Sequence, residues 1–268
     1  MKVDETKCVG CGNCVSVCTM GAISVREGRS HVEEEFCVEC GTCRRFLVDE
    51  GRPATLVRMI RSVLSWLRLR YDAPPDICPS GALYQPTLEW PRTVRQVFSD
   101  PTATHEMTGV TGRGTEEVKT NDVTGRIGPG EAGLVVELGR PGIGASFEDV
   151  QTVAVALAGR GARFEPNNPV THLMTDSTTG AVDPEVLKER VMSAIVELKC
   201  SLEEVPELLE AVDQASRGIA TVCSVGISGR CGPEGEIPYT DLIPPQFSLN
   251  PQAKTNLGLG RPGGGCQG

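Results

Sequence analysis

Two evenly spaced cysteine runs near the N-terminus constrain this chain more than any other feature. The first run, Cys8 to Cys18, has the spacing C-x₂-C-x₂-C-x₃-C, and the second, Cys37 to Cys43, begins with the same C-x₂-C-x₂-C. Three thiolates two residues apart can bind three iron corners of one cubane from a tight loop, which leaves the fourth corner for a distant cysteine. The pattern therefore predicts two [4Fe–4S] clusters. The predicted ligands are Cys8, Cys11, Cys14, Cys18, Cys37, Cys40, Cys43 and Cys78.

The segment from residue 8 to residue 83 resembles bacterial-type two-cluster ferredoxins. Its two halves end alike, in Cys18-Thr-Met-Gly-Ala-Ile and Cys78-Pro-Ser-Gly-Ala-Leu. In that family the fourth cysteine of each run ligates the other cluster. The resemblance therefore implies two mixed ligand sets. The first is Cys8, Cys11, Cys14 and Cys78, and the second is Cys37, Cys40, Cys43 and Cys18.

The chain departs from that family at two places. Thr19 stands where the family usually has proline, and 34 residues separate Cys43 from Cys78 where the family normally has three. Two other readings of the cysteines stay open, because C-x₂-C pairs also bind structural zinc and cysteines in small secreted domains form disulfides. Three evenly spaced cysteines occurring twice favour iron–sulfur chemistry over both.

Charge and hydropathy exclude several functions. The net charge is −9 and the sequence pI is about 5.0, which argues against nucleic acid as a partner because phosphate binding needs a clustered cationic face. We find no apolar stretch behind the N-terminus and no run of 18 apolar residues, so we expect neither a secretion signal nor a transmembrane segment. The sequence thus predicts a cytoplasmic protein, whose cysteines serve as metal ligands.

The insertion before Cys78, residues 44–77, predicts one helix from Pro53 to about Tyr71. Apolar residues cover most of its circumference, and a narrow polar stripe is formed by Arg58, Arg61, Ser65 and Arg68. A helix this apolar needs cover on more than one side, and we expect the C-terminal domain or another subunit to provide it. Docking to a partner, packing inside the chain and lying on a membrane surface remain open. Residues 44–70 contain seven arginines and only two acidic residues, Asp49 and Glu50, so this segment is basic.

The remaining chain divides into three predicted segments after a ferredoxin module over residues 1–92. Residues 93–131 are rich in glycine and threonine and predict a linker, and residues 231–268 form a Gly/Pro-rich tail. Residues 132–230 predict an α+β domain with helices capped at Ser146 and Ser201. Strands are expected over residues 134–138, 162–164, 170–174, 194–198 and 219–225, and a brief helix is expected at Asp183. This order fits a ferredoxin-like α+β sandwich, a βαβ repeat named for its topology and unrelated to iron.

Two features of the C-terminal domain suggest further sites. The loop Gly139-Arg-Pro-Gly-Ile-Gly resembles the strand-to-helix loop of ACT-type regulatory domains, which implies a small-ligand site; a plain Gly/Pro-rich turn is the other reading. Four cysteines lie outside the two runs, and they serve either as buried thiols or as a third metal site. They are Cys200, Cys223, Cys231 and Cys266.

The sequence thus predicts an electron-transfer protein with two [4Fe–4S] clusters, in a non-catalytic subunit of an anaerobic oxidoreductase complex. Its partners would be redox proteins or other subunits, with a homo-oligomer left open. A redox or metabolite sensor with an ACT-like ligand domain is one alternative. A catalytic subunit with a third metal site is another, although no Ser/His/Asp set, Cys/His pair or carboxylate pair indicates a catalytic residue.

Overall fold

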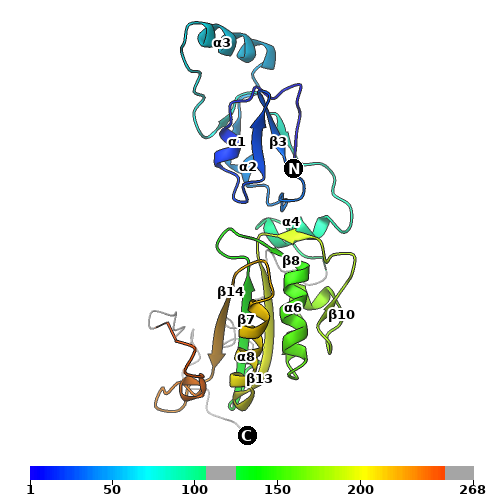
Figure 1. The fold of residues 1–268 in the computed structure, drawn as a ribbon, viewed down its shortest axis with the longest axis vertical. Helices are drawn as coiled ribbons and strands as arrows, with labels where there is room; N and C mark the ends of the chain where they lie inside the picture. Colours follow the sequence, from blue (N-terminus) through cyan, green and yellow to red (C-terminus); the bar gives the residue numbers. More distant parts are fainter. Residues whose placement is uncertain (107–124, 251–268) are drawn as a thin grey trace.

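The computed structural model describes residues 1–106 and 125–250. Figure 1 shows an N-terminal unit built of short strands and helices, placed end to end with a C-terminal unit built around a larger sheet. The chain is therefore a mixed helix-and-strand protein, as predicted. Among the described residues, no helix is long and apolar enough to cross a membrane.

Three two-stranded sheets hold the N-terminal unit together. They pair β1 (Lys2–Val3) with β6 (Leu83–Tyr84), β2 (Ile23–Arg26) with β3 (Arg29–Val32), and β4 (Val48–Asp49) with β5 (Ile77–Cys78). Strands β2 and β3 form a hairpin. Its turn residues Glu27 and Gly28 both have positive φ, as a two-residue hairpin turn of type I′ requires. Helices α1 (Asn13–Ser16) and α2 (Thr42–Phe46) lie within the two cysteine runs.

The inserted helix is α3 (Ala54–Trp66), which begins after Pro53 and is shorter than predicted. It ends where Arg68 adopts a positive φ of 59°. The C-terminal unit does not cover it, because α3 lies at the opposite end of the N-terminal unit (Figure 1). Val57 is the residue of α3 that is buried. Of the two expected covers for this helix, the C-terminal domain is therefore not the one, and cover by another subunit stays a prediction.

The predicted linker contains a helix, α4 (Thr93–Ser99), that belongs to the core of the C-terminal unit. Its Val94 and Phe98 are buried, and the Phe98 ring meets Phe147 edge to face with a centroid distance of 5.2 Å. The first residues of the predicted linker therefore belong to the folded C-terminal unit. The stretch 107–124 of that linker lies outside the described residues.

The C-terminal unit is organised around one antiparallel sheet with the strand order β14-β7-β13-β9. Its strands are β7 (Glu131–Leu138), β9 (Arg163–Phe164), β13 (Ala194–Ser201) and β14 (Cys223–Gly229). Helix α6 (Phe147–Ala158) lies between β7 and β9 in the chain, and η1 (Leu202–Glu204) and α8 (Val205–Ser216) follow β13. Alternate residues of β7 are fully buried: Ala132, Leu134, Val136 and Leu138. This period of two is that of a strand with one face on a core.

Both predicted capping boxes are present, at Ser146 with Asp149 and at Ser201 with Glu204. The segment 170–174, predicted as a strand, instead begins with helix α7 (Pro169–His172). The Asn168 side chain accepts a hydrogen bond from the backbone N–H of Val170 at 2.8 Å, and Pro169 occupies the first helical turn. These are strong helix-start signals.

The remaining elements are short. They are β8 (Ala145–Ser146) paired with β12 (Arg190–Val191), β10 (Met174–Asp176) paired with β11 (Ala181–Val182), and η2 (Thr240–Leu242). The brief helix predicted at Asp183 is a series of turns. The last strand begins at Cys223, four residues later than predicted.

Replacing Phe98 with alanine tests whether α4 belongs to the core. We expect the free energy of unfolding to fall by about 3–5 kcal/mol, because a buried ring is replaced by a cavity. Urea unfolding followed by circular dichroism measures the change. Val155→Ala is the matched control, since this α6 side chain is half exposed and should change the free energy by no more than about 0.5 kcal/mol. If Phe98→Ala lowers the free energy of unfolding by less than about 1 kcal/mol, α4 is not part of the core and belongs to the linker.

Candidate metal centres

The N-terminal unit contains a hollow of about 320 Å³ whose wall carries four cysteines. They are Cys8, Cys11, Cys14 and Cys78. Three of them come from the first run, whereas Cys78 ends strand β5. The rest of the wall is mostly apolar and includes Val9, Leu47 and Leu83. This hollow therefore brings together the ends of the two cysteine-rich segments.

A second hollow of about 350 Å³ has the complementary composition. Its cysteines are Cys18, Cys37, Cys40 and Cys43. Here three come from the second run, and Cys18 is the last cysteine of the first. Each hollow therefore draws its four cysteines from both halves of the module.

Left-handed glycines allow the cysteine loops to curl around these hollows. Gly12 and Gly41, with φ of 86° and 65°, precede α1 and α2. Gly10 has a φ of 67°, and a β-carbon built on it would lie 2.2 Å from the carbonyl oxygen of Gly28. Position 10 therefore excludes any side chain, because the first loop passes directly against the turn of the β2–β3 hairpin.

Several polar groups lie close to the sulfurs. The backbone N–H of Ser30 donates to Cys8 Sγ at 3.3 Å, and that of Ala22 donates to Cys18 Sγ at 3.2 Å. The hydroxyl of Thr19, which replaces the usual proline, lies 3.7 Å from Cys40 Sγ. Donors at this distance stabilise negative charge on sulfur. Both hollows are therefore suited to thiolates.

Burial raises the pKa of the Cys14 thiol to about 11 and that of the Cys43 thiol to about 12. Neighbouring cysteines add to the shift in both cases. Without a metal, these thiols are protonated at neutral pH. Iron binding must displace their protons, because a metal binds the thiolate form.

The donor sets fit a four-iron cube better than a single ion. In the part of the chain that the structure describes, no group of three or more His, Cys, Asp or Glu side chains is placed to hold one metal ion. The thiols stand around each hollow instead of converging on one point. Zinc needs all its sulfurs at about 2.3 Å from one centre, whereas a cubane takes one thiolate on each of four separate irons.

Two buried charged groups, which the sequence analysis did not identify, support the second hollow. Arg95 donates from Nη1 to the carbonyl oxygens of Glu34, Glu35 and Cys37 at 2.9, 3.0 and 2.9 Å, and its Nε contacts the carboxylate of Glu189. One guanidinium from α4 thereby joins the Cys37 loop to the C-terminal unit. An isolated arginine beside a predicted linker gives no sequence signal for this role.

Glu39, between Cys37 and Cys40, is the second such group. It is almost fully buried, and Arg92 donates to its carboxylate through Nε at 2.9 Å and Nη2 at 2.6 Å. Burial opposes its ionisation, but hydrogen bonds from the amino group of Met1 and from Arg92 outweigh burial and lower its pKa. A charged pair of this kind fixes the backbone between two cysteines of one set.

The three C-terminal cysteines that the structure describes do not form one cluster. Cys200 lies opposite Ala132 and Cys223 opposite Leu138, which places them near the two ends of β7, on strands that flank it on opposite sides. The two cysteines therefore do not share one place on the sheet. Cys231 is exposed, and Cys266 lies outside the described residues.

The ACT-like loop, residues 139–144, lies against the N-terminal unit. A β-carbon on Gly144 would meet the methyl group of Met20 at 2.6 Å, and one on Gly142 would lie 3.9 Å from the Thr19 carbonyl oxygen. Arg190 donates to the Ile143 carbonyl oxygen at 3.2 Å. The loop thus contacts residues that directly follow Cys18.

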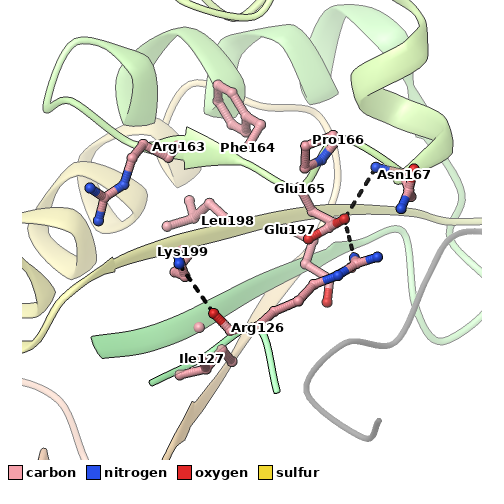
Figure 2. Close-up of a pocket in the computed structure, with 11 residues that line it drawn as sticks. Arg126, Ile127, Arg163, Phe164, Glu165, Pro166, Asn167, Glu197, Leu198 and Lys199 are labelled. Carbon is pink, nitrogen blue, oxygen red and sulfur yellow. Dashed lines mark hydrogen bonds and ion pairs between the residues drawn. The ribbon is translucent and has the colours of Figure 1, made fainter. Parts of the chain in front are cut away.

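A further hollow lies elsewhere, at the β9 edge of the C-terminal sheet. Figure 2 shows Arg126 paired with Glu165 and Lys199 donating to the Arg126 carbonyl oxygen at 3.1 Å. Its volume is about 1020 Å³, it is open to solvent, and it contains no cysteine. It is therefore separate from the candidate metal centres.

The comparisons with known proteins bear on the first cysteine run. Residues 1–24 match the family model of the 4Fe-4S binding domain. No curated protein matches the chain, and no solved structure matches it. Residues 1–24 are thus a ferredoxin-type segment for binding a [4Fe–4S] cluster, and this match supports an iron–sulfur electron-transfer protein.

Proposed function

We propose that this protein relays electrons between two [4Fe–4S] clusters, and that it does so as a subunit of an anaerobic oxidoreductase complex. One observation carries the proposal: two separate hollows each collect four cysteines from both halves of the N-terminal unit. We assign Cys8, Cys11, Cys14 and Cys78 as ligands of the first cluster. Cys18, Cys37, Cys40 and Cys43 are the ligands of the second.

The protein's own groups would adjust each site to electron transfer. A bound [4Fe–4S] cluster accepts and releases one electron at a time. The N–H groups of Ser30 and Ala22 and the positive charge of Arg61 beside Cys11 favour the more negative, reduced state of the sites they face. Burial by apolar walls has the opposite effect, because it disfavours charge.

The C-terminal unit, in this proposal, is a ferredoxin-like α+β sandwich that holds the module to its partner. The strand order β14-β7-β13-β9, with one helix after β7 and another after β13, supports that topology. We draw the domain boundary before α4 at about residue 92, because Val94 and Phe98 pack in the C-terminal core.

A metabolite sensor is the second candidate, and the hollow in Figure 2 is the observation that favours it. Arg163 lines this hollow together with the apolar side chains of Ile127 and Phe164. A sensor would bind its ligand there and transmit the change through β7 and β13 to the loop that contacts Met20. A small-molecule screen by thermal shift on the cluster-loaded protein distinguishes the two, since a relay requires no ligand.

Metal analysis of anaerobically purified protein is the primary test. We expect about eight irons and eight acid-labile sulfides per chain, as two four-iron clusters require. Dithionite-reduced samples should give electron paramagnetic resonance signals of two interacting [4Fe–4S]⁺ clusters. About twelve irons would bring the C-terminal cysteines into a third site, and zinc without sulfide would refute the proposal.

Single serine variants test the mixed ligand sets. Cys18→Ser and Cys40→Ser should perturb the same resonance signal, whereas Cys78→Ser and Cys11→Ser should perturb the other, because serine is a poor substitute for a soft thiolate ligand. Cys223→Ser is the matched control and should leave both signals unchanged. If Cys18→Ser and Cys11→Ser affect the same signal, each run binds its own cluster and the mixed assignment is wrong.

Thiol labelling tests whether the C-terminal cysteines form a site. Burial raises the pKa of Cys200 to about 11, so at pH 8 almost none of it is the reactive thiolate. Iodoacetamide should modify the exposed Cys231 in native protein and spare Cys200 until the chain is unfolded, as read by peptide mass spectrometry. Equal labelling rates at the two positions would contradict the structural role of Cys200.

A further inference from the structure

An ordinary surface helix turns its apolar face to the core and its polar face to solvent. Helix α3 does the opposite. Arg58 points onto the module, where Nη2 donates to the carbonyl oxygens of Glu5 at 3.3 Å and Cys8 at 3.1 Å. Arg61, one turn later, donates to the Gly10 carbonyl oxygen at 3.1 Å. The first two arginines of the polar stripe are therefore used inside the chain, and they hold α3 on the first cysteine loop.

The opposite face of α3 is apolar and exposed. Seven large apolar side chains lie on it or just beyond its end: Leu56, Met59, Ile60, Val63, Trp66, Leu67 and Leu69. Trp66 is 83% exposed and Met59 is 58% exposed. Between residues 54 and 66 the only charged residues are Arg58 and Arg61, so the outward face carries none. An uncharged apolar face of this size marks an interaction surface.

The local charge restricts what can cover this face. Residues 50–72 contain five arginines against Glu50 and Asp72, a formal charge of +3 in a chain of −9. A second copy of the chain would bring two such cationic segments together, which opposes self-association through α3. An anionic surface is attracted to this end of the molecule, and the acidic remainder of the chain is repelled from it.

The residue types at the end of the helix favour lipid over a protein groove. Trp66 is followed by Arg68 and Arg70, and aromatic and arginine side chains of this kind settle at the level of lipid headgroups. Helix α3 lies at one end of the molecule (Figure 1). Its exposed apolar face, here called the ridge, has no charged groups and can therefore enter the headgroup boundary of a bilayer without a matching cavity. Interfacial helices present Trp, Phe or Leu to the lipid and arginine on the other face.

We propose that α3 is an interfacial helix that binds the protein to the surface of an anionic membrane without crossing it. The ridge, from Leu56 to Trp66, enters the headgroup region, while Arg58 and Arg61 remain on the module and Arg68 lies at the level of the headgroups. Because Arg58 contacts the Cys8 carbonyl and Arg61 that of Gly10, the first cysteine loop lies directly beneath the membrane surface. The proposal rests on α3 alone and does not depend on the number of clusters.

Vesicle sedimentation with the full-length, cluster-loaded protein tests this proposal. We expect the protein to pellet with vesicles of phosphatidylcholine mixed with phosphatidylglycerol, and to bind vesicles of phosphatidylcholine alone at least about tenfold more weakly. Added salt should weaken the binding, because it screens the arginines. Trp66 emission should shift to the blue on binding, and Trp66→Phe should abolish the shift while Trp90 remains.

The double variant Met59→Ser/Val63→Ser should bind at least about tenfold more weakly, because two apolar side chains are lost from the ridge. Val155→Ser, at a similarly exposed apolar position on α6, should bind as the unmodified protein does. Visible absorption of the clusters shows that each variant is folded. The proposal is overturned if the protein stays in the supernatant with both vesicle types, or if the double variant binds equally well. A dimer that the double variant dissociates would also overturn it and assign the face to a second copy.

Discussion

The return of the chain to Cys78 is the constraint on which the N-terminal unit depends. The strands that flank the insertion pair in parallel, with Val48 opposite Ile77 and Asp49 opposite Cys78. The chain therefore leaves and re-enters the module at neighbouring positions. The length of the insertion between β4 and β5 consequently has little effect on where Cys78 lies. Loop-closure entropy rises only slowly with length, which explains how 34 residues can replace three without moving Cys78 from its hollow.

The two hollows have different surroundings. The first lies beneath α3, whose arginines hold its loop from the outer end of the module. The second lies toward the C-terminal unit, which contacts it through Arg95 and through the loop next to Met20. Cluster potentials depend on nearby charge, hydrogen bonds and solvent exposure. In the proposed relay, this difference in setting would give the two clusters different potentials.

Features with strict local rules could be predicted from the sequence. Cysteine spacing, the Glu27-Gly28 turn and the capping residues Ser146 and Ser201 each have a short-range cause, and the structure contains all of them. Features decided by distant packing could not. Helix α4 lacks a long apolar period, and it contributes Val94 and Phe98 to the core, with Val97 packed against it. Segment 170–174 has the β-branched pair Val170-Thr171, which favours a strand, but the cap at Asn168 decides the outcome.

Helix α3 shows a more general limit of sequence patterns. An amphipathic pattern identifies two faces, but burial of the apolar face follows only if the neighbouring surface is apolar. Here the neighbouring surface is the cysteine loop of residues 5–10, whose carbonyl oxygens accept hydrogen bonds from guanidinium groups. Buried carbonyls need donors, and arginine supplies several from one side chain. The polar stripe therefore turns inward, and the apolar residues become the surface that the protein presents to its surroundings.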